Sequence, residues 1–303
     1  MTLDTEYPFE GRFLDLDGLR YHYLDEGDGP TVMMLHGNPS WSFYYRRLVL
    51  ALRGEFRCIV PDHIGCGFSD KPSDDRYAYT LERRVADLEA LLDHLDLAGP
   101  IHLVVHDWGG MIGMAYAHRH PDRIARLVIL NTAAFHLPRS KSFPFALWLC
   151  RTWLGACLIR GGNVFSRAAA WVGCKRHPMP KALRDLYCLP YDSWANRIAT
   201  LRFVQDIPLR AGDPGYDLIT EVEGALHRFR PNPTLICWGM RDFVFDKRFL
   251  DAWARILPEA EVHAFDDCGH YILEDAAEEV VPLVVRHLHL EEAEKMEEKE
   301  ATQ

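Results

Sequence analysis

The chain has 303 residues, enough for one large domain with an inserted lobe or for two ordinary domains. Hydrophobic residues make up 48% of the chain and charged residues 26%, a balance typical of soluble globular proteins. The formal net charge of -10 argues against nucleic acid as a partner, because proteins that bind nucleic acid usually present a basic face.

Targeting and metal-binding signals are missing from the sequence. Residues 1–6 lack the basic and apolar segments of a signal peptide, and no apolar run approaches the roughly 20 residues that span a bilayer. The eight cysteines form no C-x-x-C pair, which argues against a zinc site or a redox motif. We therefore expect a cytoplasmic protein with reduced thiols, no metal and no cofactor.

The first predicted elements are two strands, residues 11–16 and 19–26, joined by a turn at Asp17 and Gly18. Five later runs are apolar on both faces, as the buried strands of a parallel sheet are. These runs cover residues 31–35, 57–60, 101–105, 126–130 and 234–238. Helical patterns lie between them, and strands that alternate with helices predict a doubly wound α/β fold.

The alternation of strands and helices stops after Leu130 and resumes at Thr234. We predict a helical cap at 132–215, inserted into a sheet domain made of 1–131 and 216–290. The tail, 291–303, is charged and poor in apolar residues, so we expect it to be disordered.

The predicted cap differs from the rest of the chain in composition. It holds twelve Lys or Arg residues against four Asp, a charge of +8, whereas the remainder carries -18. It also contains four of the eight tryptophans. A solvated basic surface is one interpretation. The other is that Trp148, Trp153 and Trp171, with basic neighbours, bind an acidic partner protein or an anionic membrane.

Asp107 lies where the strand at 101–105 ends and a helix starts, and residues 111–118 continue that helix. This is the setting of a nucleophile elbow, a strained turn that exposes one side chain above the sheet. The usual pattern is G-x-S-x-G, but here an aspartate takes the place of the serine. A carboxylate is ionised at neutral pH and needs no base to activate it. It can displace a leaving group at a saturated carbon and form an alkyl ester, which a histidine-activated water then hydrolyses.

Two hydrogen-bond donors are predicted beside this aspartate. Asn38 follows the strand at 31–35, in the loop that supplies an oxyanion-hole N–H in proteins with such an elbow. Trp108 directly follows Asp107, and its indole N–H can only donate. Together these groups are suited to hold a weakly hydrated halide or a carboxylate.

A histidine in the loop after the last strand is the expected base, and His270 occupies that place. Asp242, after the strand at 234–238, can accept a hydrogen bond from His270 and stabilise its charged form. Asp246 is the competing acid but has the sequence context of a residue that begins a helix. The other position for the acid, after the strand at 126–130, holds Asn131, which cannot carry the charge.

These motifs together resemble those of the haloalkane dehalogenases, over roughly residues 10–288. The resemblance implies an α/β-hydrolase fold with a mostly parallel eight-stranded sheet and an inserted helical cap. It implies catalysis by Asp107, His270 and Asp242, and halide binding by Asn38 and Trp108. The reaction implied converts a small apolar haloalkane to an alcohol and halide.

The motif pattern matches the third subfamily of haloalkane dehalogenases, which also contains β-lactone decarboxylases of olefin biosynthesis. Three stretches are closer to those decarboxylases, namely 131–135, 202–209 and 242–246. The alternative function is therefore conversion of a β-lactone to a long-chain cis-alkene and carbon dioxide. The five site residues do not separate these two functions.

Other classes match the sequence less well. An epoxide hydrolase usually carries an aromatic residue in place of Asn38 and uses two cap tyrosines, for which Tyr187 and Tyr191 are the candidates. A fluoroacetate dehalogenase has arginine in place of Trp108. Asp107 excludes a serine esterase, and the complete catalytic set argues against a non-enzymatic binding protein. Oligomeric state is not predicted by any of these patterns.

Overall fold

The computed structural model describes the backbone of residues 1–301 and the side chains of residues 1–289. Its strands form one eight-stranded sheet in the order β1-β2-β4-β3-β5-β6-β7-β8. Strand β2 pairs antiparallel with β1 and β4, and every other pair is parallel. The strands are β1 (Arg12–Leu16), β2 (Leu19–Glu26), β3 (Thr31–Leu35), β4 (Arg57–Pro61), β5 (Ile101–Asp107), β6 (Ile124–Thr132), β7 (Thr234–Gly239) and β8 (Glu261–Phe265).

This sheet confirms the predicted α/β-hydrolase fold class and the predicted N-terminal hairpin. Strand β3 is buried on both faces, and its side chains alternate between two apolar layers. Met33 and Leu35 pack in one layer, and Val32 and Met34 pack in the other. Continuous apolar runs therefore mark central strands because both faces of the sheet are covered by helices.

The helices that cover the sheet lie on its two faces. Buried side chains of α3 (Leu81–Leu95), α4 (Trp108–Arg119), α10 (Tyr216–Ala225) and α11 (Lys247–Ile256) contribute to the first layer. Those of α2 (Arg46–Leu52), α12 (Ile272–Asp275) and α13 (Ala277–Ala301) contribute to the second. Short elements complete the chain: α1 (Leu3–Glu6), η1 (Ser42–Tyr45), η2 (Pro121–Arg123), η3 (Ala195–Arg197) and η4 (Leu226–Phe229).

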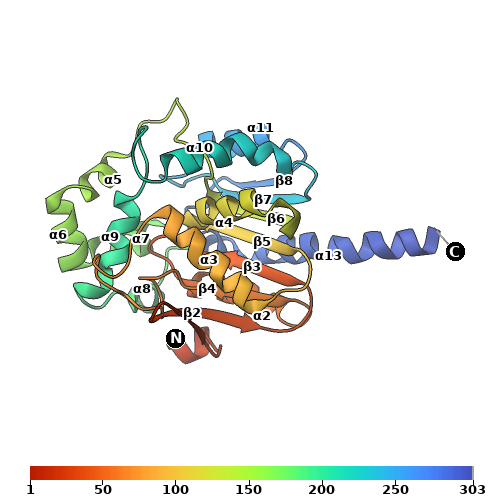
Figure 1. The fold of residues 1–303 in the computed structure, drawn as a ribbon, viewed down its shortest axis with the longest axis horizontal. Coiled ribbons are helices and arrows are strands. Elements are labelled where there is room, and N and C mark those ends of the chain that lie inside the picture. The colour runs from red at the N-terminus through yellow and green to blue at the C-terminus, as the bar shows by residue number, and fades with distance from the viewer. Residues whose placement is uncertain (302–303) are drawn as a thin grey trace.

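Five further helices lie between β6 and α10 and form one end of the molecule, opposite the C-terminal end of α13 (Figure 1). They are α5 (Phe145–Cys150), α6 (Trp153–Gly162), α7 (Val164–Val172), α8 (Lys181–Cys188) and α9 (Ile198–Gln205). The cap boundaries predicted from the sequence, 132 and 215, fall at the end of β6 and directly before α10.

Two further expectations from the sequence concern the C-terminal tail and membrane-spanning helices. The side chains of 291–303 lie outside the described residues, so the predicted disorder of this tail stays a prediction. Among the described residues, no helix is long and apolar enough to cross a membrane.

Candidate active site

Asp107 ends β5, and α4 begins at the next residue. Its backbone has φ 51° and ψ -126°, a strained conformation for a residue with a side chain. The Thr132 hydroxyl, at the end of β6, donates a hydrogen bond to the Asp107 carbonyl and helps to hold the turn. The predicted turn from strand to helix is therefore present and directs the buried Asp107 side chain to the carboxyl edge of the sheet.

Glycines allow the backbone to approach this turn closely. A Cβ on Gly109 would lie 1.9 Å from the Leu35 carbonyl oxygen, so only glycine lets α4 pack this close to β3. A Cβ on Gly37 would lie 1.9 Å from Asp107 Oδ1. The loop after β3 therefore reaches the carboxylate, and the Asn38 backbone N–H donates to Asp107 Oδ1 at 2.6 Å.

Burial dominates the electrostatics of Asp107. It raises the pKa of this carboxyl above its ordinary value, because a charge is costly in a region shielded from water. The nearby His270 ring and the backbone N–H groups of Asn38 and Trp108 oppose that rise by stabilising the charged form. Asp107 is thus a weakly solvated carboxylate. A carboxylate with little hydration is a stronger nucleophile than a fully hydrated carboxylate.

His270 lies between two carboxylates. Its Nδ1 is 2.7 Å from Asp242 Oδ2, and its Nε2 is 3.7 Å from Asp107 Oδ2. The second distance is an ion-pair contact rather than a hydrogen bond. Burial by itself lowers the pKa of His270, but Asp242 and Asp107 outweigh it and raise the pKa above the ordinary value. The ring is therefore poised to carry a positive charge next to Asp107.

Asn131, which sequence reasoning treated only as an unsuitable acid, holds Asp242 in place. Its Nδ2 donates to Asp242 Oδ2 and to the Gly239 carbonyl, both at 3.0 Å, and its Oδ1 accepts from the Gly239 N–H at 2.8 Å. The Val244 N–H donates to the other Asp242 oxygen at 2.8 Å. The position of Asn131 directly after the predicted strand at 126–130 was the only sequence signal for this contact, and in the structure Asn131 lies within the last residues of β6.

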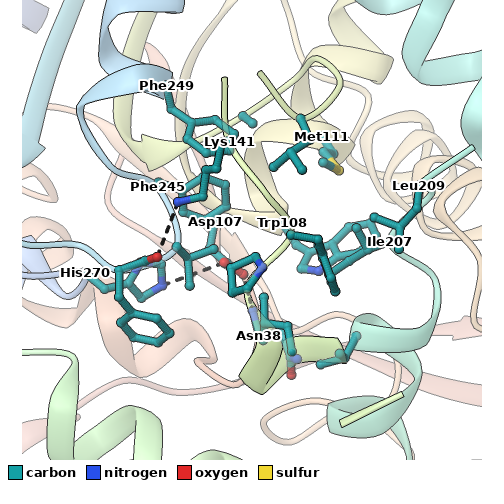
Figure 2. A pocket seen from close by; sticks show the side chains of 18 of the residues that line it. Asn38, Asp107, Trp108, Met111, Lys141, Ile207, Leu209, Phe245, Phe249 and His270 are labelled. Carbon is teal, nitrogen blue, oxygen red and sulfur yellow. Dashed lines mark hydrogen bonds and ion pairs between the residues drawn. The ribbon is translucent and has the colours of Figure 1, made fainter. Parts of the chain in front are cut away.

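Asn38 and Trp108 both line the cavity above Asp107, and Figure 2 shows them on the side of the carboxylate away from His270. Asn38 Nδ2 donates one hydrogen to the Thr200 carbonyl on α9 at 3.1 Å, which leaves its second hydrogen available. Asn38 Oδ1 is buried and has no hydrogen-bond partner among the described residues. The Asn38 amide is thus oriented by the helices between β6 and α10, which was not foreseen.

The cavity above Asp107 has mostly apolar walls. Helices α5 and α7 contribute Leu147, Phe165 and Ala169, and the loop around residue 245 contributes aromatic side chains. Lys141 is the one lysine among the wall residues; it pairs with Asp246 at 2.8 Å. Among the wall residues, the polar side chains next to Asp107 are Asn38, Trp108 and His270. Lys141 and His136 are the other polar side chains of the wall.

Comparison with known proteins places this site in a family. The family model described as alpha/beta hydrolase fold matches residues 30–277. Haloalkane dehalogenase 2 of Mycobacterium tuberculosis is 30% identical, over 92% of this chain and 95% of the relative. A cis-3-alkyl-4-alkyloxetan-2-one decarboxylase of Shewanella oneidensis is 61% identical, over 92% of this chain and 88% of the relative. The chain belongs to the α/β-hydrolase family, among the haloalkane-dehalogenase-like enzymes.

A solved structure agrees with this membership. An ancestral haloalkane dehalogenase, AncHLD2, matches with a TM-score of 0.83 and 26% identity, covering 93% of this chain and 99% of its own. The chain is therefore an enzyme of the α/β-hydrolase class, as the sequence predicted.

The remaining candidates from the sequence have other contacts in this enzyme. Asp246 caps α11, where its side chain accepts a hydrogen bond from the Arg248 N–H. The Tyr187 hydroxyl donates to Glu274 at 2.6 Å, and the Tyr191 hydroxyl donates to the Ser40 carbonyl at 3.3 Å. Neither tyrosine lines the cavity, which argues against the epoxide-hydrolase alternative. Among the described residues, no group of three His, Cys, Asp or Glu side chains is arranged to hold a metal ion.

Proposed function

We propose that this enzyme converts a cis-3,4-dialkyl β-lactone, an oxetan-2-one, to a cis-alkene and carbon dioxide. The observation that carries the proposal is the similarity to the Shewanella oneidensis decarboxylase, which at 61% identity is twice that to the Mycobacterium tuberculosis dehalogenase, at 30%. The site geometry suits both reactions, so the degree of similarity decides between them. The alternative function from the sequence thus becomes the favoured one.

Asp107 is the proposed nucleophile, and its carboxylate attacks ring carbon 4 of the lactone. A bond forms between Oδ and carbon 4, and the bond from carbon 4 to the ring oxygen breaks with its electron pair. The lactone thereby opens to a carboxylate, covalently attached to the enzyme through an alkyl ester. The N–H groups of Asn38 and Trp108 are placed to stabilise the negative charge as it develops on the leaving oxygen.

Carbon dioxide leaves in the second step. The bond between carbons 2 and 3 breaks, and its electron pair forms the double bond between carbons 3 and 4. The bond from carbon 4 to Asp107 breaks at the same time, and its pair returns to the carboxylate. No water is consumed. The charged His270, held by Asp242, stabilises Asp107 as it leaves, and apolar walls disfavour the substrate carboxylate relative to neutral carbon dioxide.

The direct test is incubation with a synthetic cis-3,4-dialkyl-oxetan-2-one in water labelled with oxygen-18. We expect alkene as the organic product, detected by gas chromatography and mass spectrometry, and no alkene from Asp107→Ala. A labelled β-hydroxy acid as the main product would show that the enzyme hydrolyses the lactone instead, and would contradict the proposal.

Haloalkane hydrolysis is the second candidate, favoured by the same donor pair and by the relatives that carry this name. In that reaction His270 activates the water that cleaves the ester. Incubation with 1,2-dibromoethane tests it through release of bromide. Bromide release without alkene formation from the lactone would reverse the order of the two candidates.

A further inference from the structure

The outer surface of helices α5, α6 and α7 is unusually apolar. Among the described residues, the three most exposed large hydrophobic side chains are Trp153, Phe145 and Trp171, at 81%, 74% and 65% exposure. They belong to α6, α5 and α7, respectively, which are among the helices that form one end of the molecule (Figure 1). Further exposed hydrophobic residues on the same helices are Trp148, Leu154, Leu158 and Val164. Patches of this kind on a soluble protein usually mark an interaction surface.

The exposed residues follow the helical repeat. On α7, the exposed positions Val164, Arg167, Ala168 and Trp171 share one face. The opposite face of α7 carries residues of the cavity wall, and Leu147 of α5 lines the cavity as well. Helices α5 and α7 therefore each have apolar residues that face the cavity and apolar residues that face solvent.

The charge of this region has one sign only. From residue 132 to residue 184 the chain contains no Asp or Glu, but it contains nine Lys or Arg residues. The guanidinium of Arg184 lies 4.3 Å from the Trp171 ring centroid, and its Nη1 donates to the Met179 carbonyl. Arg160 lies 4.8 Å from the Trp194 ring and donates to a backbone carbonyl as well. Among the described residues, neither arginine forms a salt bridge with a carboxylate; both donate to backbone carbonyls instead.

We propose that the outer surface of α5, α6 and α7 docks on an anionic lipid membrane. Exposed tryptophan and phenylalanine enter the interfacial layer favourably, and basic residues beside them attract anionic headgroups. The whole chain carries -10, so an anionic membrane repels the molecule on average and favours an orientation with residues 132–184, which contain no Asp or Glu, toward the lipid.

Docking would also place the cavity next to the bilayer, because α5 and α7 separate the two. If the proposed function holds, its dialkyl substrate dissolves in the bilayer and would enter between these helices. The docking itself does not depend on that function, and it is measured without substrate.

The test is flotation of the full chain with vesicles of phosphatidylcholine alone and of phosphatidylcholine with phosphatidylglycerol, at low and physiological salt. We expect binding to the anionic vesicles, weaker at the higher salt. Quenching of tryptophan fluorescence by brominated lipid would report insertion of the aromatic side chains rather than adsorption by charge.

Variants separate the two contributions. The double variant Phe145→Ser, Trp153→Ser should lower the partition coefficient by about ten-fold or more, because it removes the two most exposed apolar side chains of the surface. Arg167→Glu should lower binding to anionic vesicles by about five-fold or more and leave binding to neutral ones unchanged. Val262→Ser on β8, where Val262 is 41% exposed, is the matched control and should bind normally.

Two results would overturn the proposal. One is the absence of binding to either vesicle by the folded wild-type chain. The other is a dimer in sedimentation velocity that the double variant converts to a monomer, without vesicle binding by either protein, because the surface would then contact a second copy. Neither result would affect the proposed function if the enzyme still turned over the β-lactone at its normal rate without vesicles.

Discussion

Among single residues, Asp107 combines three properties that rarely occur together in one side chain. It is buried, its backbone is strained, and its carboxyl must be charged for the proposed attack on the substrate. Burial raises its pKa, so the native state binds a proton at this carboxyl more tightly than the unfolded chain does. The stability linked to that proton is present below the unfolded pKa of about 3.9 and is lost as pH rises through the native pKa.

We therefore expect Asp107→Asn to melt at a higher temperature than the wild type at neutral pH. The amide keeps an oxygen that can accept from the Asn38 N–H but carries no charge to desolvate. The difference should narrow as pH falls, since wild-type Asp107 then becomes neutral as well. Thermal unfolding followed by circular dichroism across pH measures this, and a variant less stable than wild type at neutral pH would refute the argument.

Trp108 supplies an N–H at the point where negative charge is proposed to develop. Trp108→Phe keeps an aromatic ring against Phe203, whose centroid is 5.3 Å away, but removes the donor. Loss of one such donor typically costs on the order of 100-fold in turnover. Steady-state kinetics with the best substrate checks this, and full activity in the variant would make Trp108 a packing residue only.

Asn131 acts through Asp242 and is a positioning residue. Asn131→Ala removes the donor at 3.0 Å from Asp242 Oδ2, so the full negative charge of Asp242 faces His270. We expect turnover to fall about ten-fold or more, since a hydrogen bond to a charged group contributes about 1.5–3 kcal/mol. The pKa of His270 should rise further, measured by nuclear magnetic resonance titration. A fall in turnover with an unchanged titration would point to a general loss of structure.

At the scale of elements, the contact of α4 with β3 sets where the site lies. A Cβ on Gly109 meets only backbone, the Leu35 carbonyl at 1.9 Å and the His36 oxygen at 3.0 Å, and neither can rotate away. Gly109→Ala should therefore push α4 from the sheet, lower the melting temperature and abolish turnover. Gly224→Ala is the matched control, because a Cβ there meets nothing within 4 Å. In helix α10 it should be neutral or stabilising, by up to about 1 kcal/mol.

Across the whole molecule, an ion pair joins α3 to the residue that follows α9, and both of its side chains are buried. Arg84 Nη1 lies 2.9 Å from Asp206 Oδ2, and the guanidinium covers the Phe203 ring at 3.8 Å. Burial raises the pKa of Asp206 to about 7 despite the partly compensating charge of Arg84. The pair therefore contributes less to stability than its short distance suggests, and its role is to fix α9 against the sheet domain.

A double-mutant cycle tests this pair. Arg84→Met leaves a buried carboxylate without its partner and should destabilise the protein by about 3–5 kcal/mol at pH 8. The cost should be smaller at pH 5, where Asp206 is protonated. Arg84→Met with Asp206→Leu should recover most of the loss, as measured by urea unfolding. A double variant as unstable as the single one would assign the loss to packing instead of charge.

The fold and the membership of the enzyme class could both be predicted from local patterns in the sequence. Buried strands can be recognised in the sequence, because a run that is apolar on both faces suits only the centre of a sheet covered on both sides. The turn around Asp107 is equally local, since the strand, the aspartate and Gly109 are contiguous. These features depend on neighbours along the chain, and the predicted strands and the observed ones differ mainly at their ends.

Several contacts of the side chains at the site could not be predicted, because they depend on how distant segments pack. Asn131 and Asp242 are 111 positions apart, and Asn38 and Thr200 are 162 apart, so no local pattern encodes either hydrogen bond. The sequence could not place Tyr187 and Tyr191, the candidate tyrosines of the epoxide-hydrolase alternative, whereas in the structure their hydroxyls donate to Glu274 and to the Ser40 carbonyl. Hydrophobic periodicity records which residues avoid water, but the partner of a buried polar group depends on which segments the fold brings together.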